Sequence, residues 1–259
     1  MRVATWNVNS LKARMPRVLE LLDQQRPDVL CLQETKCAAK DFCVEELQRA
    51  GYNAVHHSAG RWAGVAILAR EPLTDPVTGL PGEHRTDEAR WVEATVAGVR
   101  VCCAYVPNGR EVGSEWFRAK LTFLDAIARR TQQLRGIPMI LAGDFNVTRE
   151  DRDVYDPAAF AGSTHVTAPE RDHLDHVIDA ADLVDAYRFL HPDAQQFTWW
   201  DYRMGAFHRG LGLRIDYMLL SRALAGGLEH CGVERDFRKG KKPSDHAPLI
   251  AVLRQEPTG

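Results

Sequence analysis

Carboxylate, amide, phenol and imidazole side chains recur at the points where the predicted strands of this chain end. Asn7 and Asn9 close the first strand, and Glu34 comes directly after the second. Further polar groups stand in four later segments, at residues 105–109, 143–146, 214–217 and 244–246. One such residue alone is typical of a turn or a helix cap. Their recurrence at strand ends predicts a common site, because loops held by a rigid sheet are where proteins collect ligand groups.

The residue types in these segments suit chemistry at phosphorus. Carboxylate and amide oxygens are preferred by hard divalent cations, and a carboxylate can also activate an attacking water. Asn, Tyr and His supply the hydrogen-bond donors that a developing charge on phosphate needs. The chain contains neither the Gly-x-x-x-x-Gly-Lys loop of nucleotide hydrolases nor the Gly-x-Ser-x-Gly turn of serine hydrolases. We therefore expect hydrolysis at phosphorus. We do not expect phosphate to be held as in a nucleotide hydrolase, or a serine hydrolase that transfers acyl groups.

The elements that must position these side chains follow from hydrophobic spacing. Residues 3–7 and 29–32 are predicted as strands, and Leu11, Met15 and Leu22 recur at helical spacing behind a capping Ser10. The chain thus opens as a βαβ unit. Further strands are expected at 52–57, 64–69, 91–97, 99–106, 138–144, 213–220 and 249–253, and helices at 114–134, about 172–181 and 183–190. Strands outnumber long helices, which favours a mixed-sheet α/β protein.

Length, composition and charge limit the class of protein. The 259 residues are 45% hydrophobic and 26% charged, which excludes collagen-like, disordered and coiled-coil classes. A net charge of -2 excludes a uniformly basic nucleic-acid coat, but not a local basic surface. No Gly/Ser/Pro-rich linker divides the sequence. We expect one domain over residues 1–254, followed by a C-terminal tail over 255–259.

The first residues and the cysteines indicate the compartment. Polar residues interrupt the first strand too early for the apolar core of a signal peptide, and no apolar run approaches the roughly 18 residues of a membrane span. The six cysteines contain no Cys-x-x-Cys pair and are expected to be reduced and mostly buried. The adjacent Cys102 and Cys103 should point to opposite faces of a strand. We expect a cytoplasmic monomer that makes no membrane contact.

Six motifs occur in one order and span nearly the whole chain. They are Trp6-Asn7-Val8-Asn9-Ser10, Leu32-Gln33-Glu34-Thr35-Lys36, Ala104-Tyr105-Val106-Pro107-Asn108-Gly109, Gly143-Asp144-Phe145-Asn146, Gly212-Leu213-Arg214-Ile215-Asp216-Tyr217 and Ser244-Asp245-His246-Ala247-Pro248. In these the chain resembles the exonuclease III type of abasic-site DNA endonuclease, within the endonuclease/exonuclease/phosphatase superfamily. The resemblance implies a four-layer α/β sandwich, with two packed mixed β-sheets flanked by helices.

The same resemblance implies a metal-dependent DNA-repair nuclease. Its activities would be cleavage 5′ of abasic sites in duplex DNA and removal of nucleotides, phosphates or phosphodiesters at DNA 3′ ends. Mg²⁺ or Mn²⁺ would be the cofactor, and Glu34 its main ligand, with Asn7 and Asp245 beside it. Asn9 stands where relatives carry Asp, which puts a second metal contact at this turn in doubt. The enzyme would be associated with the nucleoid through its DNA substrate.

Catalytic roles are also implied by the resemblance. Asp144 would orient and deprotonate the attacking water, and Asn146 would hold water or a phosphate oxygen. Both residues would also lie at the metal. Asp216 would fix the tautomer of His246 and favour its charged form, so that His246 can donate to the phosphate. Tyr105 would donate to the same phosphate.

Two segments add basic and aromatic groups near these motifs. Residues 235–242 carry five basic side chains and lead into the motif of His246, and residues 197–203 mix aromatics with Arg203. Such combinations suit a phosphate backbone and a flipped-out nucleotide. In the family, residues matching Trp199 and Leu213 line a pocket for a bare sugar, and one matching Arg203 wedges into the duplex. The DNA-binding residues expected in all are Lys36, Arg90, Asn108, Arg110, Trp199, Trp200, Arg203, Leu213, Lys239, Lys241 and Lys242.

Alternatives remain at this point. Another phosphoesterase of the superfamily, such as a phosphoinositide phosphatase, a sphingomyelinase or a deoxyribonuclease I-like enzyme, shares the same residue types. A catalytically inactive nucleic-acid-binding module is an alternative from a different class. Lys36, the aromatic segment and the absence of secretion and disulfide signals favour the DNA-repair nuclease. Trp199 is alternatively a core residue. His173 and His176 are three apart without a third ligand pattern, so we expect a solvated helix face there.

Overall fold

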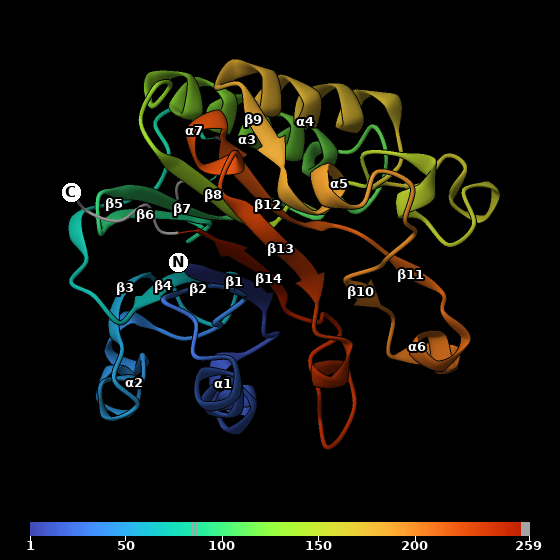
Figure 1. The fold of residues 1–259 in the computed structure, drawn as a ribbon. Coiled ribbons are helices and arrows are strands. Elements are labelled where there is room, and N and C mark those ends of the chain that lie inside the picture. Colours follow the sequence, from blue (N-terminus) through green and yellow to red (C-terminus); the bar gives the residue numbers. More distant parts are fainter. Residues whose placement is uncertain (84, 86, 255–259) are drawn as a thin grey trace.

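Two mixed β-sheets pack face to face, and helices cover their outer surfaces (Figure 1). The computed structural model describes residues 1–83, 85 and 87–254. In Figure 1, α1 (Leu11–Gln25) and α2 (Val44–Arg49) lie below one sheet, and α3 (Glu115–Gln133) and α4 (Ala168–Ala180) lie above the other. The predicted four-layer α/β sandwich is confirmed. The predicted tail at 255–259 lies outside the described residues.

Each sheet has six strands. The first has the order β13 (Leu228–Val233), β14 (Leu249–Leu253), β1 (Arg2–Asn7), β2 (Val29–Gln33), β4 (Val65–Ala69), β3 (Asn53–His57). The second has the order β5 (Thr74–Thr78), β6 (Trp91–Val96), β7 (Val99–Tyr105), β8 (Met139–Asp144), β12 (Asp216–Ser221), β9 (Leu183–Asp185). A separate two-stranded ribbon joins β10 (Trp199–Trp200) and β11 (Gly212–Leu213).

Two parallel strand pairs decide where the polar residues meet. β1 and β2 are parallel and connected through α1, and β7 and β8 are parallel and connected through α3. Parallel neighbours need such a crossover, and their carboxyl ends then share one edge. β12 runs antiparallel to β8 and begins with Asp216 opposite Asp144. The sequence segments that carry the polar groups are thereby brought to a common end of the sandwich.

Apolar side chains fill the space between the sheets and beneath the outer helices. Cys103 lies in the core between the sheets, whereas Cys102 lies in the core that faces α3. This confirms that the two neighbours point to opposite faces of β7. The six cysteines are free thiols, and four of them are buried, as predicted.

Shorter helices complete the fold. They are α5 (Ala186–Leu190), α6 (Ala206–Arg209) and α7 (Arg222–Ala225), with single 3₁₀ turns at Ala39–Asp41, Asp151–Asp153, Ala158–Phe160, Arg203–Gly205 and Arg235–Arg238. Across the part of the chain that the structure describes, no helix is both long enough and apolar enough to traverse a bilayer.

Three predicted elements differ from the structure. The helix expected at about 172–181 begins earlier, because Thr167 and Glu170 form a capping box ahead of it. The helix expected at 183–190 is preceded by the strand β9, and Asp185 then caps α5. The strand expected at 213–220 is interrupted after Leu213, because Arg214 turns into a buried ion pair with Asp153 at 2.8 Å.

Candidate active site

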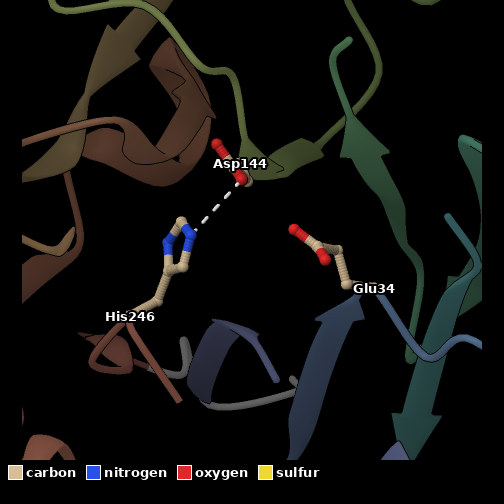
Figure 2. A group of neighbouring side chains, drawn as sticks. All are labelled: Glu34, Asp144 and His246. Atoms are coloured by element: carbon tan, nitrogen blue, oxygen red, sulfur yellow. Dashed lines mark ion pairs between the residues drawn. The ribbon is translucent and has the colours of Figure 1, made fainter. Parts of the chain in front are cut away.

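Three ionisable side chains meet at the common end of the two sheets. Glu34 follows β2, Asp144 ends β8, and His246 precedes β14. Figure 2 shows Glu34 and His246 reaching from the side of the first sheet toward Asp144 on the second. One ligand atom from each residue lies within 4.8 Å of the others. We call these three residues the catalytic cluster.

Amide and phenol groups orient the two carboxylates of the catalytic cluster. The Nδ2 group of Asn7 donates to Glu34 Oε1 and to Asp144 Oδ2, both at 2.9 Å. The Tyr105 hydroxyl donates to Glu34 Oε1 at 3.0 Å. The backbone N–H of Asn146 donates to Asp144 Oδ1 at 2.9 Å. Donors from three strand ends thus fix both carboxylates, as a preorganised site requires.

A buried histidine–aspartate pair borders the cluster. His246 Nδ1 donates to Asp216 Oδ2 at 2.8 Å, and His246 Nε2 lies 3.7 Å from Asp144 Oδ2. Burial alone lowers the pKa of His246, but the carboxylates of Asp216 and Asp144 outweigh burial and raise that pKa to about 10. The imidazole is therefore a cation at neutral pH and keeps a proton on Nε2 that it can donate.

Burial and neighbouring charges also shift the pKa values of other groups in the site. Burial raises the pKa of Asp144 to about 7, and the charge of Asp216 adds to the shift although His246 opposes it. A carboxyl group with a pKa near neutrality is suited to take a proton from water. Burial also raises the pKa of Tyr105 well above its usual value, and Glu34 adds to this, so the phenol stays protonated as a donor.

Unusual backbone conformations place these side chains. Glu34 and Asn146 have left-handed φ values of 54° and 53°, which non-glycine residues rarely adopt. Glu34 directly follows β2 and Asn146 comes two residues after the end of β8, so the chain turns sharply where each strand ends. A Cβ at Gly143 would lie 1.9 Å from the carbonyl oxygen of Ala104 on β7. Glycine is therefore needed where β7 and β8 approach just before Asp144.

The cluster has the donor set of a hard divalent cation. The carboxylates of Glu34 and Asp144 face the same space, and such oxygens are the ligands that Mg²⁺ and Mn²⁺ accept. A cation of the chain itself already contacts this oxygen set, because Lys36 Nζ lies 2.6 Å from Glu34 Oε2. Burial raises the pKa of Glu34, but Lys36 outweighs burial and lowers it, so Glu34 is ionised. These residues therefore fit a divalent metal.

Two other predicted metal ligands have protein partners. The Oδ1 atom of Asn7 accepts from the N–H of Asn9 at 3.0 Å, so the amide nitrogen faces the cluster instead of the oxygen. Asp245 lines the adjoining cavity, where its two oxygens accept from Asn9 Nδ2 at 3.2 Å and Trp199 Nε1 at 3.1 Å. Metal ligation by Asn7 and Asp245 stays a prediction.

The three residues of the catalytic cluster line a cavity of about 170 Å³. Trp199 and Leu213 form its apolar side, and Asn108 and Asn146 form a polar side. Asn146 Nδ2 is turned to a backbone carbonyl, that of residue 106, at 2.9 Å. The residues expected to bind a sugar and a phosphate thus share one cavity.

His165 completes the wall of this cavity, and the sequence analysis missed it. Its Nδ1 contacts the carbonyl oxygen of Asn146, and its Nε2 lies 3.4 Å from Asn108 Nδ2. Burial lowers the pKa of His165 to about 4, and the charge of Lys120 adds to this, so the ring is neutral. No sequence signal marks it, because it lies in a loop whose contacts are all distant in sequence apart from Glu170.

A groove continues from the cluster past Tyr105. It has a volume of about 350 Å³ and includes four residues predicted to bind DNA, namely Lys36, Arg90, Asn108 and Arg110. Two tryptophans that the sequence analysis did not single out, Trp62 and Trp116, also line it. The Arg110 guanidinium lies 3.7 Å from the ring centre of Trp116. Cations and aromatic faces beside the cluster suit a nucleic-acid strand.

The basic segment 235–242 leads in sequence into the motif of His246. Lys241 and Lys242 are exposed, as is Lys239, which pairs with Asp236. Arg238, which was not predicted, is largely buried and donates to the carbonyl oxygen of Trp200 at 3.2 Å. This segment presents lysines to solvent and anchors itself through Arg238.

The aromatic segment divides into exposed and buried parts. Arg203 is exposed and paired with Asp201 at 2.6 Å, so its contact with DNA stays a prediction. Trp200 is fully buried and packs edge-on against Phe207. Trp200 therefore supports the segment from beneath, which corrects the prediction that it contacts DNA.

The remaining histidines form no second metal site in the described ranges. Glu34, Asp144 and His246 are the one group there of three or more potential ligands in mutual reach. His176 is exposed on α4, and His173 bonds the carbonyl oxygen of Pro169 at 2.6 Å. The predicted solvated helix face agrees with this placement.

A carboxylate pair with a charged histidine, held at the end of a β-sandwich, defines a metal-dependent phosphoester hydrolase. The chain belongs to the Endonuclease/Exonuclease/phosphatase family, whose model matches residues 4–246. Within that family it is a DNA-repair nuclease of the exonuclease III type.

Three relatives illustrate the similarity. Exodeoxyribonuclease III of Haemophilus influenzae is 30% identical over 98% of this chain and 100% of its own. The 3′-5′ exonuclease NExo of Neisseria meningitidis is 38% identical, with a TM-score of 0.95 over 98% of this chain and 100% of its own. An AP endonuclease of Archaeoglobus fulgidus is 34% identical, with a TM-score of 0.94 over 98% and 99%. NExo has also been solved as a 3′ phosphatase bound to a product DNA hairpin.

The metal assignment gives a first testable prediction. Glu34 supplies the carboxylate of the turn that follows β2. Its Oε2 atom lies 2.6 Å from Lys36 Nζ, so a cation already contacts this oxygen. We expect Glu34→Ala to lower the rate of DNA hydrolysis and to raise the Mg²⁺ concentration needed for half the maximal rate, because a hard cation loses an oxygen ligand. The measurement is a metal titration of wild type and variant. A titration midpoint that does not move would remove Glu34 from the metal site.

Proposed function

We propose that this chain removes 3′-phosphates and terminal nucleotides at DNA 3′ ends, and that incision 5′ of abasic sites is its slower activity. Both reactions would use the catalytic cluster and one Mg²⁺ or Mn²⁺ ion. The substrate would be double-stranded DNA, and the enzyme a monomer. The position of His165 is the observation that supports this order of the two rates.

His165 narrows the cavity in which a flipped-out sugar would have to bind. It stands in the wall with Trp199 and Leu213, in a cavity of only about 170 Å³. A terminal phosphate must bring only its own oxygens to the cluster. An abasic nucleotide within a strand must also place its sugar in the cavity after leaving the stack. The His165 imidazole would therefore restrict abasic incision more than removal of a 3′-phosphate.

The relatives support the same order without excluding the slower activity. The Neisseria structures similar to this chain are named a 3′ phosphatase and a 3′-5′ exonuclease. The Archaeoglobus relative is named an AP endonuclease. Abasic incision is thus kept as a second candidate, because the apolar wall of Trp199 and Leu213 is what a bare sugar would contact.

The chemistry follows from the groups around the cluster. Asp144 would accept the proton of the attacking water, which its near-neutral pKa permits. The His246 imidazolium and the Tyr105 hydroxyl would donate to the phosphate oxygens as negative charge develops. A bound divalent cation at Glu34 and Asp144 would neutralise phosphate charge. Asp216 accepts from Nδ1 of His246 and favours the charged ring, so that Nε2 keeps the proton that it would donate to the phosphate.

The test compares rates on matched duplexes. One carries a 3′-phosphate at a nick, and the other carries an abasic analogue at the same position. We expect 3′-phosphate removal to be at least ~10-fold faster, a modest specificity difference for a pocket contact. His165→Ala should raise the abasic rate relative to the phosphatase rate, whereas the exposed His176→Ala should leave the ratio unchanged. Equal rates in wild type, or a ratio that His165→Ala does not move, would contradict the proposal.

The sugar pocket gives a second prediction. Trp199 is half-buried, and its ring forms the apolar wall of the cavity. We expect Trp199→Ala to reduce abasic incision more than 3′-phosphate removal, because the latter does not need the sugar pocket. The measurement is the ratio of the two rates, with thermal stability followed in parallel. If both activities fall equally together with stability, Trp199 is a packing residue and the pocket assignment is wrong.

The basic segment gives a third prediction. The net charge is -2, so DNA must meet a local basic surface. Neutralising Lys239, Lys241 and Lys242 together should weaken duplex binding and flatten its salt dependence, by up to about one unit of slope per lost phosphate contact. Binding isotherms at several salt concentrations measure this. A slope equal to that of wild type would mean that the segment points away from DNA.

A further inference from the structure

A lysine and a glutamate are buried together beneath the cavity. Lys120 lies on α3, and Glu170 lies in the first turn of α4. They form an ion pair, and neither side chain is exposed to solvent. Lys and Glu are almost never fully buried unless they are paired. Neither side chain takes part in the chemistry described above, although the charge of Lys120 helps to keep the ring of His165 neutral.

The lysine ammonium also binds the two loops that carry the polar wall of the cavity. Lys120 Nζ donates to the backbone carbonyl of Asn146 at 2.6 Å and to that of Asn108 at 3.2 Å. The side chains of the same two asparagines line the cavity. Asn146 holds a left-handed backbone conformation with a φ of 53°. Such a conformation persists only where its surroundings impose it, and the ammonium is one of the groups that do.

The glutamate extends the arrangement to a third loop. Its Oε1 accepts from the backbone N–H of His165 at 2.9 Å and from the Thr164 hydroxyl at 2.7 Å. Its Oε2 accepts from the Thr167 hydroxyl at 2.7 Å. Lys120 and Glu170 together thus connect the loops that follow β7 and β8 with the loop that precedes α4.

Stability alone does not account for a buried pair of this kind. Removing two charges from water is costly, and well-packed apolar residues of similar size often replace a buried ion pair without loss of stability. An apolar pair would, however, remove the ammonium donor from both carbonyl groups, and would leave that of Asn146 with the ring of His165 and that of Asn108 with the Thr164 hydroxyl. The ion pair supplies an ammonium that fixes the direction of these two loops. An apolar pair cannot do this.

We infer that Lys120 is a positioning residue of the active site, which fixes the loops that carry Asn146 and Asn108 at the cavity by holding their backbone carbonyls. The assay of this inference rests on the proposed function. A displacement of about 1 Å at a positioned group can cost ~10²-fold in rate. Lys120 therefore affects kcat although it touches no substrate.

Three variants separate positioning from stability. Lys120→Met removes the donor and leaves Glu170 unpaired, so kcat for 3′-phosphate removal should fall at least ~10-fold and Tm should fall with it. The double variant Lys120→Met/Glu170→Met removes both charges and should regain Tm but not kcat. Glu170→Gln keeps Lys120 bonded to the carbonyls of Asn146 and Asn108. It should therefore retain more activity than Lys120→Met or the double variant. If Lys120→Met does not fold, the double variant and Glu170→Gln carry the comparison.

A matched control uses a second buried carboxylate near the far end of α3. Glu93 is fully buried and pairs with Arg130 of α3 at 2.5 Å and with Arg100 at 3.1 Å. Glu93→Gln should lower Tm and leave kcat within about twofold, because its contacts do not reach the cavity. If the double variant recovers kcat together with Tm, or if Glu93→Gln lowers kcat as much as Lys120→Met, the inference is overturned.

A readout that needs no turnover separates this inference from the proposed function. The side-chain amide resonances of Asn108 and Asn146 in nitrogen-15 NMR spectra should shift or broaden in Lys120→Met and in the double variant, but not in Glu93→Gln. Unchanged resonances in the double variant would overturn the positioning role, whatever the activity. A wild-type protein that releases no phosphate from any DNA substrate would instead refute the proposed function.

Discussion

Replacing Asp144 by asparagine is expected to lower kcat for 3′-phosphate removal by at least ~10²-fold, the lower range for a positioned proton-transfer group. Asparagine keeps the size of the side chain, and its one oxygen can accept one of the two hydrogen bonds that Asp144 accepts on separate oxygens, from Asn7 and from the backbone N–H of Asn146. It cannot take a proton from water, and it is a weaker ligand for a cation. The loss should therefore appear mainly in kcat, with a smaller effect on Tm from the one hydrogen bond that asparagine cannot accept.

The measurement is single-turnover phosphate release at saturating enzyme, together with binding of the same hairpin DNA by anisotropy. DNA affinity should stay within about threefold, because the phosphate backbone is held mainly by basic side chains outside the cluster. Asp175→Asn is a suitable control, since Asp175 lies on α4, pairs with Arg149 at 2.6 Å and does not line the active-site cavity. Turnover at the wild-type rate in Asp144→Asn would remove this residue from the chemical step.

Replacing His246 by alanine should also cost at least ~10²-fold in kcat, because it removes a charged donor from the phosphate. The imidazole is held by Asp216 at 2.8 Å in a fully buried pair. Its removal leaves the Asp216 carboxylate buried without its partner, so a fall in Tm should accompany the loss.

Asp216→Asn distinguishes the two effects in this variant. It keeps the imidazole in place but weakens the preference for a charged ring, since the carboxylates are what raise the pKa of His246. We expect Asp216→Asn to lower kcat by less than His246→Ala and in the same direction. The exposed His176→Ala serves as the control on α4. If His246→Ala retains wild-type kcat while losing stability, the histidine is a structural residue and does not donate to the phosphate.

The strand–helix–strand halves of the site could be predicted from the sequence. The apolar run at 29–32 and the helical spacing behind Ser10 define a βαβ unit, and parallel strands bring Asn7 and Glu34 to one edge. The same reasoning applies to Tyr105 and Asp144 on β7 and β8. Local periodicity and crossover geometry are enough here, because each half is continuous in sequence.

Two strands that the sequence analysis did not predict, β5 and β13, lack such a local signal. β5 contains a proline and is exposed along its whole length at a sheet edge, and β13 interleaves charged, His and Gly residues. Their pairing with neighbouring strands, rather than their own propensity, makes them strands. The early start of α4 could have been predicted from the sequence, because Thr167 and Glu170, three residues apart, form a capping box.

His165 and Lys120 could not have been assigned from the sequence. Lys120 sits within a predicted helix, where a lysine is usually exposed, and its burial depends on Glu170, which is 50 residues away. His165 enters the cavity because the loop between β8 and α4 folds back onto the residues that follow β7 and β8. Both positions follow from tertiary packing, which no periodicity records.

Phosphate release from a DNA hairpin that carries a 3′-phosphate tests the assigned chemistry most directly. With Mg²⁺ or Mn²⁺ present, the wild-type protein should release inorganic phosphate, EDTA should abolish the release, and added metal should restore it. Asp144→Asn should remain at least ~10²-fold slower at every metal concentration. Failure of the wild-type protein to release phosphate with either metal, or release that persists in EDTA, would contradict a metal-dependent DNA 3′-end hydrolase built on Glu34, Asp144 and His246.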